Sequence, residues 1–244
     1  MIKFFRHIRK SIIMENKSSK YFKYAIGEIV LVVIGILIAL QINNWNQEHN
    51  NRDIANNYIT NLIEELNIQI ETLDNVYISR FDRKLKGLES AKSYFEKPFT
   101  IKDTLSFLNN ISFGAVGSYG IEDFNRNVFE SLISTGVITH IEPNLRNKIL
   151  DHYEYARHVA DRSQAQASNY QDVVNGLRPF YIGEEKPMSR TDQIRFINAI
   201  STEEFIKQVN IEISNALHSM RRILKVKNNA ENLIILIEQY LETH

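Results

Sequence analysis

The chain contains no cysteine, only four prolines and only nine glycines in 244 residues. Without cysteine it has no disulfide, no thiol nucleophile and no zinc site built on thiolates. Proline and glycine are the residues that most often interrupt regular structure, so their scarcity indicates few breaks and long elements. Long elements are helices far more often than strands, and we therefore expect an all-α fold.

The chain also lacks a net charge, because 29 Lys and Arg balance 29 Asp and Glu. A neutral total gives no general reason to expect nucleic-acid binding. The charges are nevertheless unevenly placed: residues 1–24 hold seven cations and one carboxylate, whereas the remaining residues hold 22 cations and 28 carboxylates. A basic head followed by an acidic body indicates that the two parts of the chain meet different environments.

Sequence motifs that identify common active sites are missing. No two of the seven histidines have the i, i+4 spacing of a zinc-binding helix, and the Glu-x-x-His pattern of di-iron bundles is absent. Neither G-x-S-x-G, nor the Walker A motif, nor a G-x-G-x-x-G opening a βαβ unit is present. We expect no catalytic residue, no cofactor and no metal. The alternative is an enzyme with an unrecognised site, for instance in a cleft under the Gly-rich loop 113–120.

One long apolar run follows the basic head. Residues 25–42 read AIGEIVLVVIGILIALQI, and eighteen helical residues are about 27 Å long, close to the ~30 Å hydrocarbon core of a bilayer. Aromatic side chains suited to the membrane interfaces flank it, namely Tyr21, Phe22 and Tyr24 on one side and Trp45 on the other. The run is longer than the apolar region of an ordinary signal peptide, and no small-residue cleavage site follows it. We expect an uncleaved signal anchor with a transmembrane helix at 25–45.

The positive charges predict the orientation of this helix. After the span, Arg52 is the only Lys or Arg before residue 60. The positive-inside rule then places residues 1–24 in the cytoplasm and residues 46–244 in the periplasm, with one crossing of the inner membrane. Residues 3–13 could form a basic amphipathic helix on the anionic inner leaflet, or a disordered tail that only sets the topology. The lipid bilayer is thus the first expected partner.

One carboxylate lies inside the membrane segment. At 100° per residue, Glu28, Gly35 and Ala39 fall within about 20° of one line along the helix. Gly35 and Ala39 form a small-xxx-small pair, which permits close approach of a second helix. This face predicts a homo-oligomer or pairing with a partner membrane protein, with Glu28 inside the contact. The alternative is that Glu28 reaches the headgroups or pairs with Lys20 or Lys23.

The body after the membrane segment has helical periodicity. Apolar side chains recur every three or four residues from Ile54 to Leu88, which predicts an amphipathic stalk helix that continues the membrane helix, with a possible break at Gly87. The neighbouring Glu64 and Glu65 are expected to be an ordinary surface pair. No stretch is typical of a strand, and no internal repeat is visible.

Capping residues and helix breakers predict the remaining helices. The expected helices and their signals are 100–112 with Thr100 as N-cap, 122–134 ended by Gly136, a long helix from Pro143 to about 175, a short one from Ser189 or Thr191 to Ile200, and a last long one from the capping box at 201–204 to the terminus. Long and short helices in this order predict an antiparallel helical bundle.

Several stretches resemble a family of uncharacterised bacterial single-pass membrane proteins. The strongest are the opening FFRHIR and the segment YAIGEIVLVVIGILIALQINNWN at 24–46. The pattern Phe129-x-x-Leu-x-x-x-Gly136, followed by Pro143-x-Leu-x-x-x-Ile-Leu-x-x-Tyr, is also similar to that of the family. The family has no assigned activity, so the resemblance implies a topology and a class of protein and adds no catalytic residue.

Together these features predict a membrane-anchored extracytoplasmic helical module without catalytic activity, which acts in sensing or in the assembly of an envelope complex. A head of 24 residues is too short for a kinase or cyclase. Any signal would therefore pass through a partner or through a change in oligomer packing. A ligand pocket inside the bundle would favour a sensor, an apolar surface patch an assembly subunit, and a deep polar pocket an enzyme.

Overall fold

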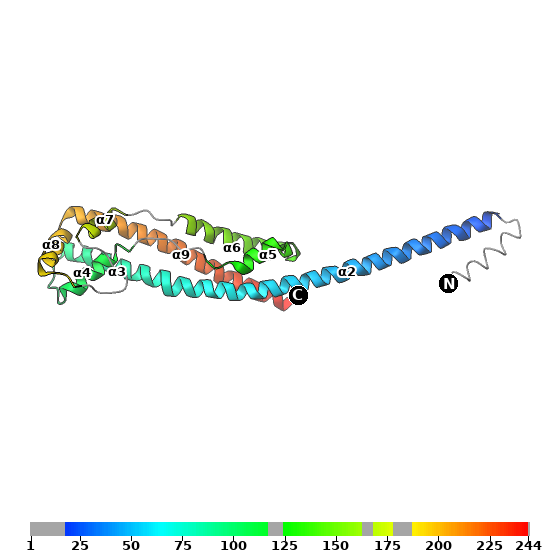
Figure 1. The fold of residues 1–244 in the computed structure, drawn as a ribbon, viewed down its shortest axis with the longest axis horizontal. Coiled ribbons are helices and arrows are strands. Elements are labelled where there is room, and N and C mark those ends of the chain that lie inside the picture. Colours follow the sequence, from blue (N-terminus) through cyan, green and yellow to red (C-terminus); the bar gives the residue numbers. More distant parts are fainter. Residues whose placement is uncertain (1–17, 117–123, 163–167, 178–186, 244) are drawn as a thin grey trace. The chain divides into compact units, whose positions relative to one another are not determined.

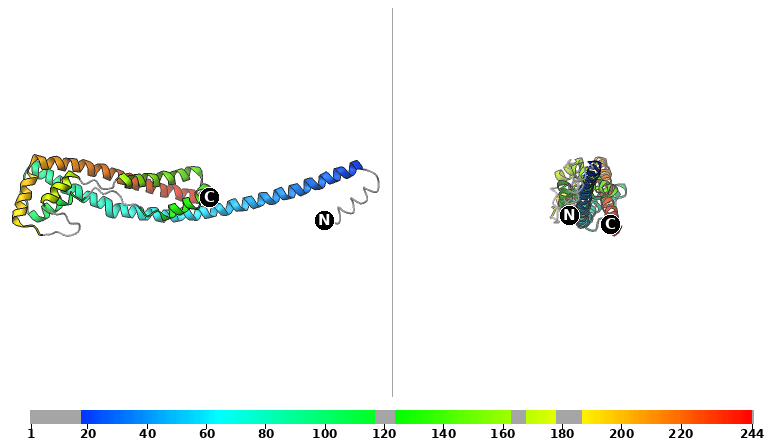
Figure 2. Two further views of the ribbon diagram at one scale, coloured as in Figure 1. Left: turned by 45° about the horizontal axis from the view of Figure 1, so that its top comes forward. Right: turned by 90° about the vertical axis from the view of Figure 1, so that its right-hand side faces the viewer.

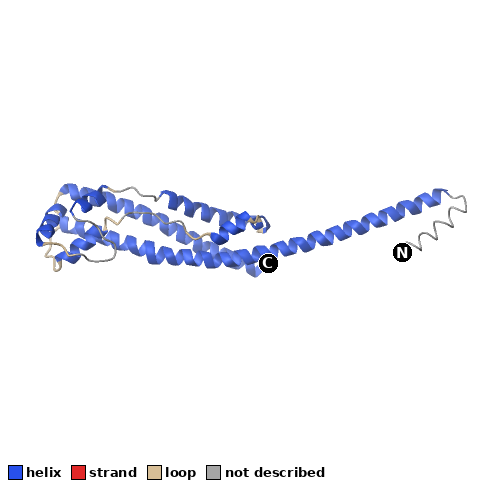
Figure 3. Ribbon diagram, in the orientation of Figure 1, coloured by secondary structure: helices blue, strands red, loops and turns tan. Residues whose placement is uncertain are grey.

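A computed structural model describes residues 18–116, 124–162, 168–177 and 187–243 of the chain. All regular elements in these ranges are helices, which confirms the predicted all-α fold (Figures 1 and 3). Most of the basic head and the second half of the Gly-rich loop lie outside the described residues. The chain divides into two compact units, Met1–Ile54 and Ala55–His244.

The first unit contains the predicted membrane segment, which belongs to helix α2 (Ser18–Thr72). Within the described residues, this is the one helix that is long and apolar enough to cross a membrane. None of the side chains in its most apolar stretch is buried against the rest of the protein. Its length and composition therefore allow this helix to cross a membrane.

The second unit is an antiparallel bundle of long helices (Figures 1 and 2). The last part of α2 continues through η1 (Leu73–Ile78) into α3 (Ser79–Glu96). Helix α9 (Glu203–Thr243) runs in the opposite direction, because its Lys227 pairs with Asp74 and its Glu212 pairs with Lys84. Helix α6 (Pro143–Arg162) lies against α9 and follows the direction of α2 and α3, since its start packs beside the end of α2 and its last turns beside η1 and α3.

Short helices close the two ends of this unit. At one end lie α4 (Thr104–Phe113), α7 (Asn169–Leu177) and α8 (Arg190–Ile200), and at the other lie α5 (Asn127–Ser134) and the 3₁₀ turn η2 (Val137–His140) (Figure 1). Three clusters of buried apolar side chains fill the interior between them. Gly136 has φ of 74° after α5, a left-handed conformation that confirms it as the predicted end of that helix.

The element η1 is a turn of π-helix within an otherwise continuous helix. Buried side chains at Gln69, Leu73, Tyr77, Phe81 and Leu85 are spaced by four residues in every step. In a straight α-helix each such step advances the side chain by 40° beyond a full turn, so the buried stripe would rotate away from the core. The wider π turn absorbs this excess and keeps the stripe facing inward.

Two predicted N-caps were placed wrongly and one was placed correctly. Helix α4 is capped by Asp103, whose carboxylate accepts a hydrogen bond from Ser106 N at 3.0 Å, and not by Thr100. At the start of α9 the Thr202 hydroxyl accepts from Phe205 N, one residue later than the predicted cap. Helix α8 is capped by Ser189, one of the two caps predicted for it. Adjacent Ser, Thr and Asp residues are all good caps, so the sequence could not separate them.

Helix lengths also differ from the prediction at three places. The expected helix from Pro143 to about 175 corresponds to α6, which ends at Arg162, and α7, which begins at Asn169, and residues 163–167 between them lie outside the described residues. Helix α5 begins at Asn127 instead of 122. Gly87 does not break α3: a Cβ there would lie 2.0 Å from Asn110 O, so this glycine lets α4 approach α3.

Candidate functional site

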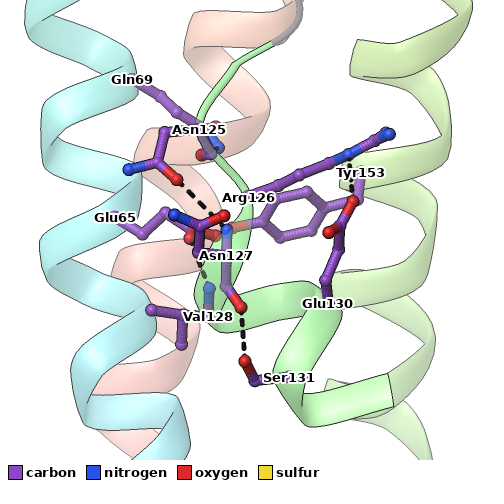
Figure 4. Close-up of polar contacts among 9 residues, drawn as sticks. All are labelled: Glu65, Gln69, Asn125, Arg126, Asn127, Val128, Glu130, Ser131 and Tyr153. Atoms are coloured by element: carbon purple, nitrogen blue, oxygen red, sulfur yellow. Dashed lines mark hydrogen bonds and ion pairs between the residues drawn. The ribbon is translucent and has the colours of Figure 1, made fainter. Parts of the chain in front are cut away.

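Glu65 is buried between three helices and joins them through one carboxylate (Figure 4). Its side chain comes from α2 and accepts a hydrogen bond from the Tyr153 hydroxyl of α6 at 2.6 Å. It also accepts one from Val128 N in the first turn of α5 at 2.8 Å. The first backbone N–H groups of a helix have no partner within it and carry a partial positive charge. Glu65 therefore caps α5 from another helix, which explains why α5 begins where it does.

One turn further along α2, Gln69 connects α6 to the segment before α5. Its Nε2 donates to Asn125 O at 3.3 Å, and its Oε1 lies 3.1 Å from His152 Nε2. Because this Oε1 can only accept, His152 Nε2 carries the proton and donates it. His152 Nδ1 is then a buried acceptor, and it has no hydrogen-bond partner in the described part of the chain. We call Glu65, Gln69, His152 and Tyr153 the polar junction.

Burial changes the titration of the polar junction. His152 is 3% exposed, and burial lowers its pKa to about 4. Burial and the hydrogen bond to Glu65 raise the pKa of Tyr153, whose ring stacks on Phe129 with centroids 4.0 Å apart. At neutral pH the junction thus holds an uncharged imidazole and an uncharged phenol beside the carboxyl group that caps α5.

A second buried polar contact joins α3 and α9. Lys84 and Glu212 form an ion pair, and both side chains are 2% exposed. The Lys84 ammonium also donates to Val116 O at 2.7 Å, directly after α4. Burial lowers the pKa of Lys84, and the charge of Glu212 opposes that shift. Removing either partner would leave a charge in the core, so this pair fixes the register of α3 against α9.

These polar groups bond to one another across helices and are closed to solvent. A catalytic acid or base must reach a substrate, and neither the polar junction nor the Lys84–Glu212 pair is open to one in the described ranges. No group of three His, Asp or Glu side chains is placed to hold a metal ion in the part of the chain that the structure covers. The arrangement can hold helices in register and can respond to protonation.

The end of the second unit that carries α4, α7 and α8 has a groove and exposed apolar side chains. An open groove there runs between the end of α3 and the start of α9, and its lining consists of Phe95, Glu203, Ile206, Lys207, Asn210 and Ile211. At the same end, Tyr94, Phe99 and Phe107 form a cluster of aromatic rings with centroids 5.3 to 5.8 Å apart. Phe99 is 47% exposed, as is Ile211. We call the groove and this aromatic cluster the tip.

The residues predicted for the membrane interface and helix contact all lie on α2 in the first unit. Phe22 and Trp45 are largely exposed, and the side chains of Tyr21 and Tyr24 lie outside the described residues. Trp45 also stacks on His49 one turn later. A Cβ added at Gly35 would meet no atom of the protein within 4 Å. The Glu28, Gly35 and Ala39 face remains a prediction.

The sequence prediction missed the polar junction. Glu65 was expected at the surface with Glu64 and is 4% exposed instead. The available signal was position: Glu65 and Gln69 fall on the same helical face as Leu62 and Leu66, inside the apolar stripe. Lys84 likewise lies between Phe81 and Leu85. A polar residue within such a stripe needs a buried partner, which the sequence alone does not identify.

Comparison with known proteins assigns the chain to a family. A family model described as "Family of unknown function (DUF6090)" matches residues 28–166, which is more than half of the chain. The match includes most of the predicted membrane segment, the polar junction and α6. No curated protein and no solved structure matches the chain. The chain therefore belongs to DUF6090, a family of unknown function.

Proposed function

We propose that this protein is a non-catalytic module, anchored in the inner membrane, that binds another envelope protein through its tip. The proposal rests on three features: the predicted membrane segment, the helical bundle of the second unit and the apolar groove. Of the two roles predicted from the sequence, it favours assembly over sensing. The tip is the observation that carries it.

The tip has the composition of a protein-binding surface. Aromatic side chains are enriched in such interfaces, and a few of them usually supply most of the binding energy. Phe95, Phe99 and Ile211 present apolar surface there, while Glu203 and Lys207 provide charges at the edge of the groove. Small-molecule sites are enclosed and bury most of their ligand. An open groove suits the surface of a protein partner better.

The charge asymmetry supports the anchored arrangement. Residues 1–24 are strongly basic, and Arg52 is the only Lys or Arg shortly after the membrane segment. This distribution favours a cytoplasmic head and a periplasmic bundle. The partner would then be an envelope protein that the bundle can meet outside the cytoplasm.

Photo-crosslinking in intact cells tests the tip. A photoreactive amino acid would replace Ile211 or Phe99, and the control would carry it at the exposed Asn228 of α9, away from the groove. We expect a discrete adduct of the same partner from both tip positions and none from Asn228. Ile211→Arg in the Phe99 crosslinking variant should abolish that adduct. Equal labelling from tip and control positions would contradict the proposal.

We also propose that the membrane segment self-associates through Glu28, Gly35 and Ala39. The support is the shared helical face together with the free space around Gly35, which leaves room for a second helix. A second copy would present two tips to the partner and raise its effective affinity.

A further inference from the structure

We propose that the polar junction is an acid-sensitive clasp: neutral His152 fastens α6 to α2, and protonation of His152 releases α5 and α6 from α2. This inference is independent of the proposed docking at the tip. It concerns the interior of the bundle and rests on how few partners His152 has there.

The hydrogen bonds of His152 fit only its neutral form. Its Nε2 donates to Gln69 Oε1, and its Nδ1 is buried without a partner in the described residues. A proton on Nδ1 would place a positive charge and an unsatisfied donor in a site that is 3% exposed. Neither is tolerated without a nearby acceptor or counter-charge. Protonation therefore favours any conformation that exposes the ring to water.

The groups around His152 do not readily compensate for the positive charge and the additional N–H of a protonated ring. On α2, Glu65 already accepts from Tyr153 and Val128, and Gln69 is neutral. On α5, Arg126 and Glu130 bond to each other. Helix α9 contributes Ala230 and Leu233 to the core cluster that contains Tyr153, and its Lys227 forms an ion pair with Asp74 of η1.

The direction of the pH effect follows from the two environments of the ring. In the closed bundle the pKa of His152 is about 4, whereas an imidazole in water has a pKa of about 6.5. The open form binds the proton more tightly, so opening is favoured as the pH falls from about 6.5 toward 4. Above pH 6.5 the neutral ring contributes its full stability. Between pH 7.5 and 5, linkage predicts an increase of about 25-fold in the opening equilibrium of α6.

Hydrogen exchange of the full chain in lipid nanodiscs tests the clasp. Amides of α5 and α6 would be followed from pH 7.5 to 5, corrected for the intrinsic pH dependence of exchange, with α8 as the internal reference. We expect opening of α6 to rise about 25-fold and that of α8 to stay nearly constant. His152→Gln keeps a donor toward Gln69 and cannot titrate, so its α6 should lose the pH dependence. His158→Gln removes an exposed histidine of the same helix and should retain it.

An α6 that opens equally at both pH values, or a His152→Gln variant with the parental pH dependence, would overturn the proposal. If His152→Gln proves too unstable to compare, the imidazole signals of the parent protein decide. In that measurement the imidazole signals of His152 should titrate below pH 5. Titration of His152 near pH 6.5, the value of an imidazole in water, would show that no clasp exists.

Discussion

At the scale of single residues, Glu65 determines where a distant helix begins. Its carboxylate accepts hydrogen bonds from Val128 N and from the Tyr153 hydroxyl, so three helices meet at one side chain. The sequence marks Glu65 only as a charged residue within an apolar stripe. The partners lie 63 and 88 residues away along the chain, and local patterns carry no information about pairings at that distance. The buried stripe was therefore predictable, and the function of its polar members was not.

Glu65→Ala should lower the free energy of unfolding by about 3 kcal/mol, because it leaves a buried hydroxyl and a buried N–H without their acceptor. Chemical denaturation of the detergent-solubilised protein, followed by circular dichroism, measures this loss. Glu64→Ala is the matched control, since Glu64 is adjacent and exposed. Its effect should stay within about 0.5 kcal/mol. Equal losses in the two variants would show that Glu65 does not cap α5.

At the scale of elements, helix type and periodicity could be read from the sequence, whereas exact boundaries could not. The amphipathic stripes of α3, α6 and α9 were visible because burial against one core imposes the same period on each. The start of α5 depends on a tertiary contact, the hydrogen bond from Val128 N to Glu65. The sequence does carry a signal for the π turn, namely four successive spacings of four residues from Gln69 to Leu85.

Deleting Val76 should be tolerated, because removing one residue from the π turn leaves an α-helix with nearly the same orientation of the residues on both sides. Deleting Lys86, an exposed residue of α3, should be far more damaging, since it rotates Leu88 and Ala91 by 100° away from the core. Thermal unfolding of both variants measures the difference. If the Val76 deletion unfolds as readily as the Lys86 deletion, the π turn does not serve to keep the buried stripe facing the core.

For the membrane helix, Gly35→Ile should weaken self-association about tenfold, roughly 1.4 kcal/mol, by blocking close approach of a second helix. Gly27→Ile introduces the same side chain about 80° away from Gly35 around the helix and should have little effect. A Cβ added at either glycine would have no neighbour within 4 Å, so both positions have room for a side chain. A reporter of helix association in a bacterial inner membrane provides the measurement. Association of Gly35→Ile at the parental level would refute this face.

At the scale of the whole molecule, composition and charge were the most informative features. The scarcity of proline and glycine predicted an all-helical chain, and the structure has only helices over its described ranges. The apolar run predicted a membrane helix, and the structure has a helix there that is long and apolar enough to cross a membrane. The tip could not be predicted, because Phe95 and Ile211 lie more than a hundred residues apart and meet only when α3 and α9 pack.

The proposed function requires one membrane crossing that separates a cytoplasmic head from a periplasmic bundle. The chain has no cysteine, so a single introduced one is the only thiol available for labelling. Ser19→Cys marks the head and Ser214→Cys marks an exposed position of α9. In intact spheroplasts, a membrane-impermeant maleimide should label the Ser214→Cys variant alone, and permeabilisation should expose both thiols. Labelling of the Ser19→Cys variant with protection of the Ser214→Cys variant would contradict the account.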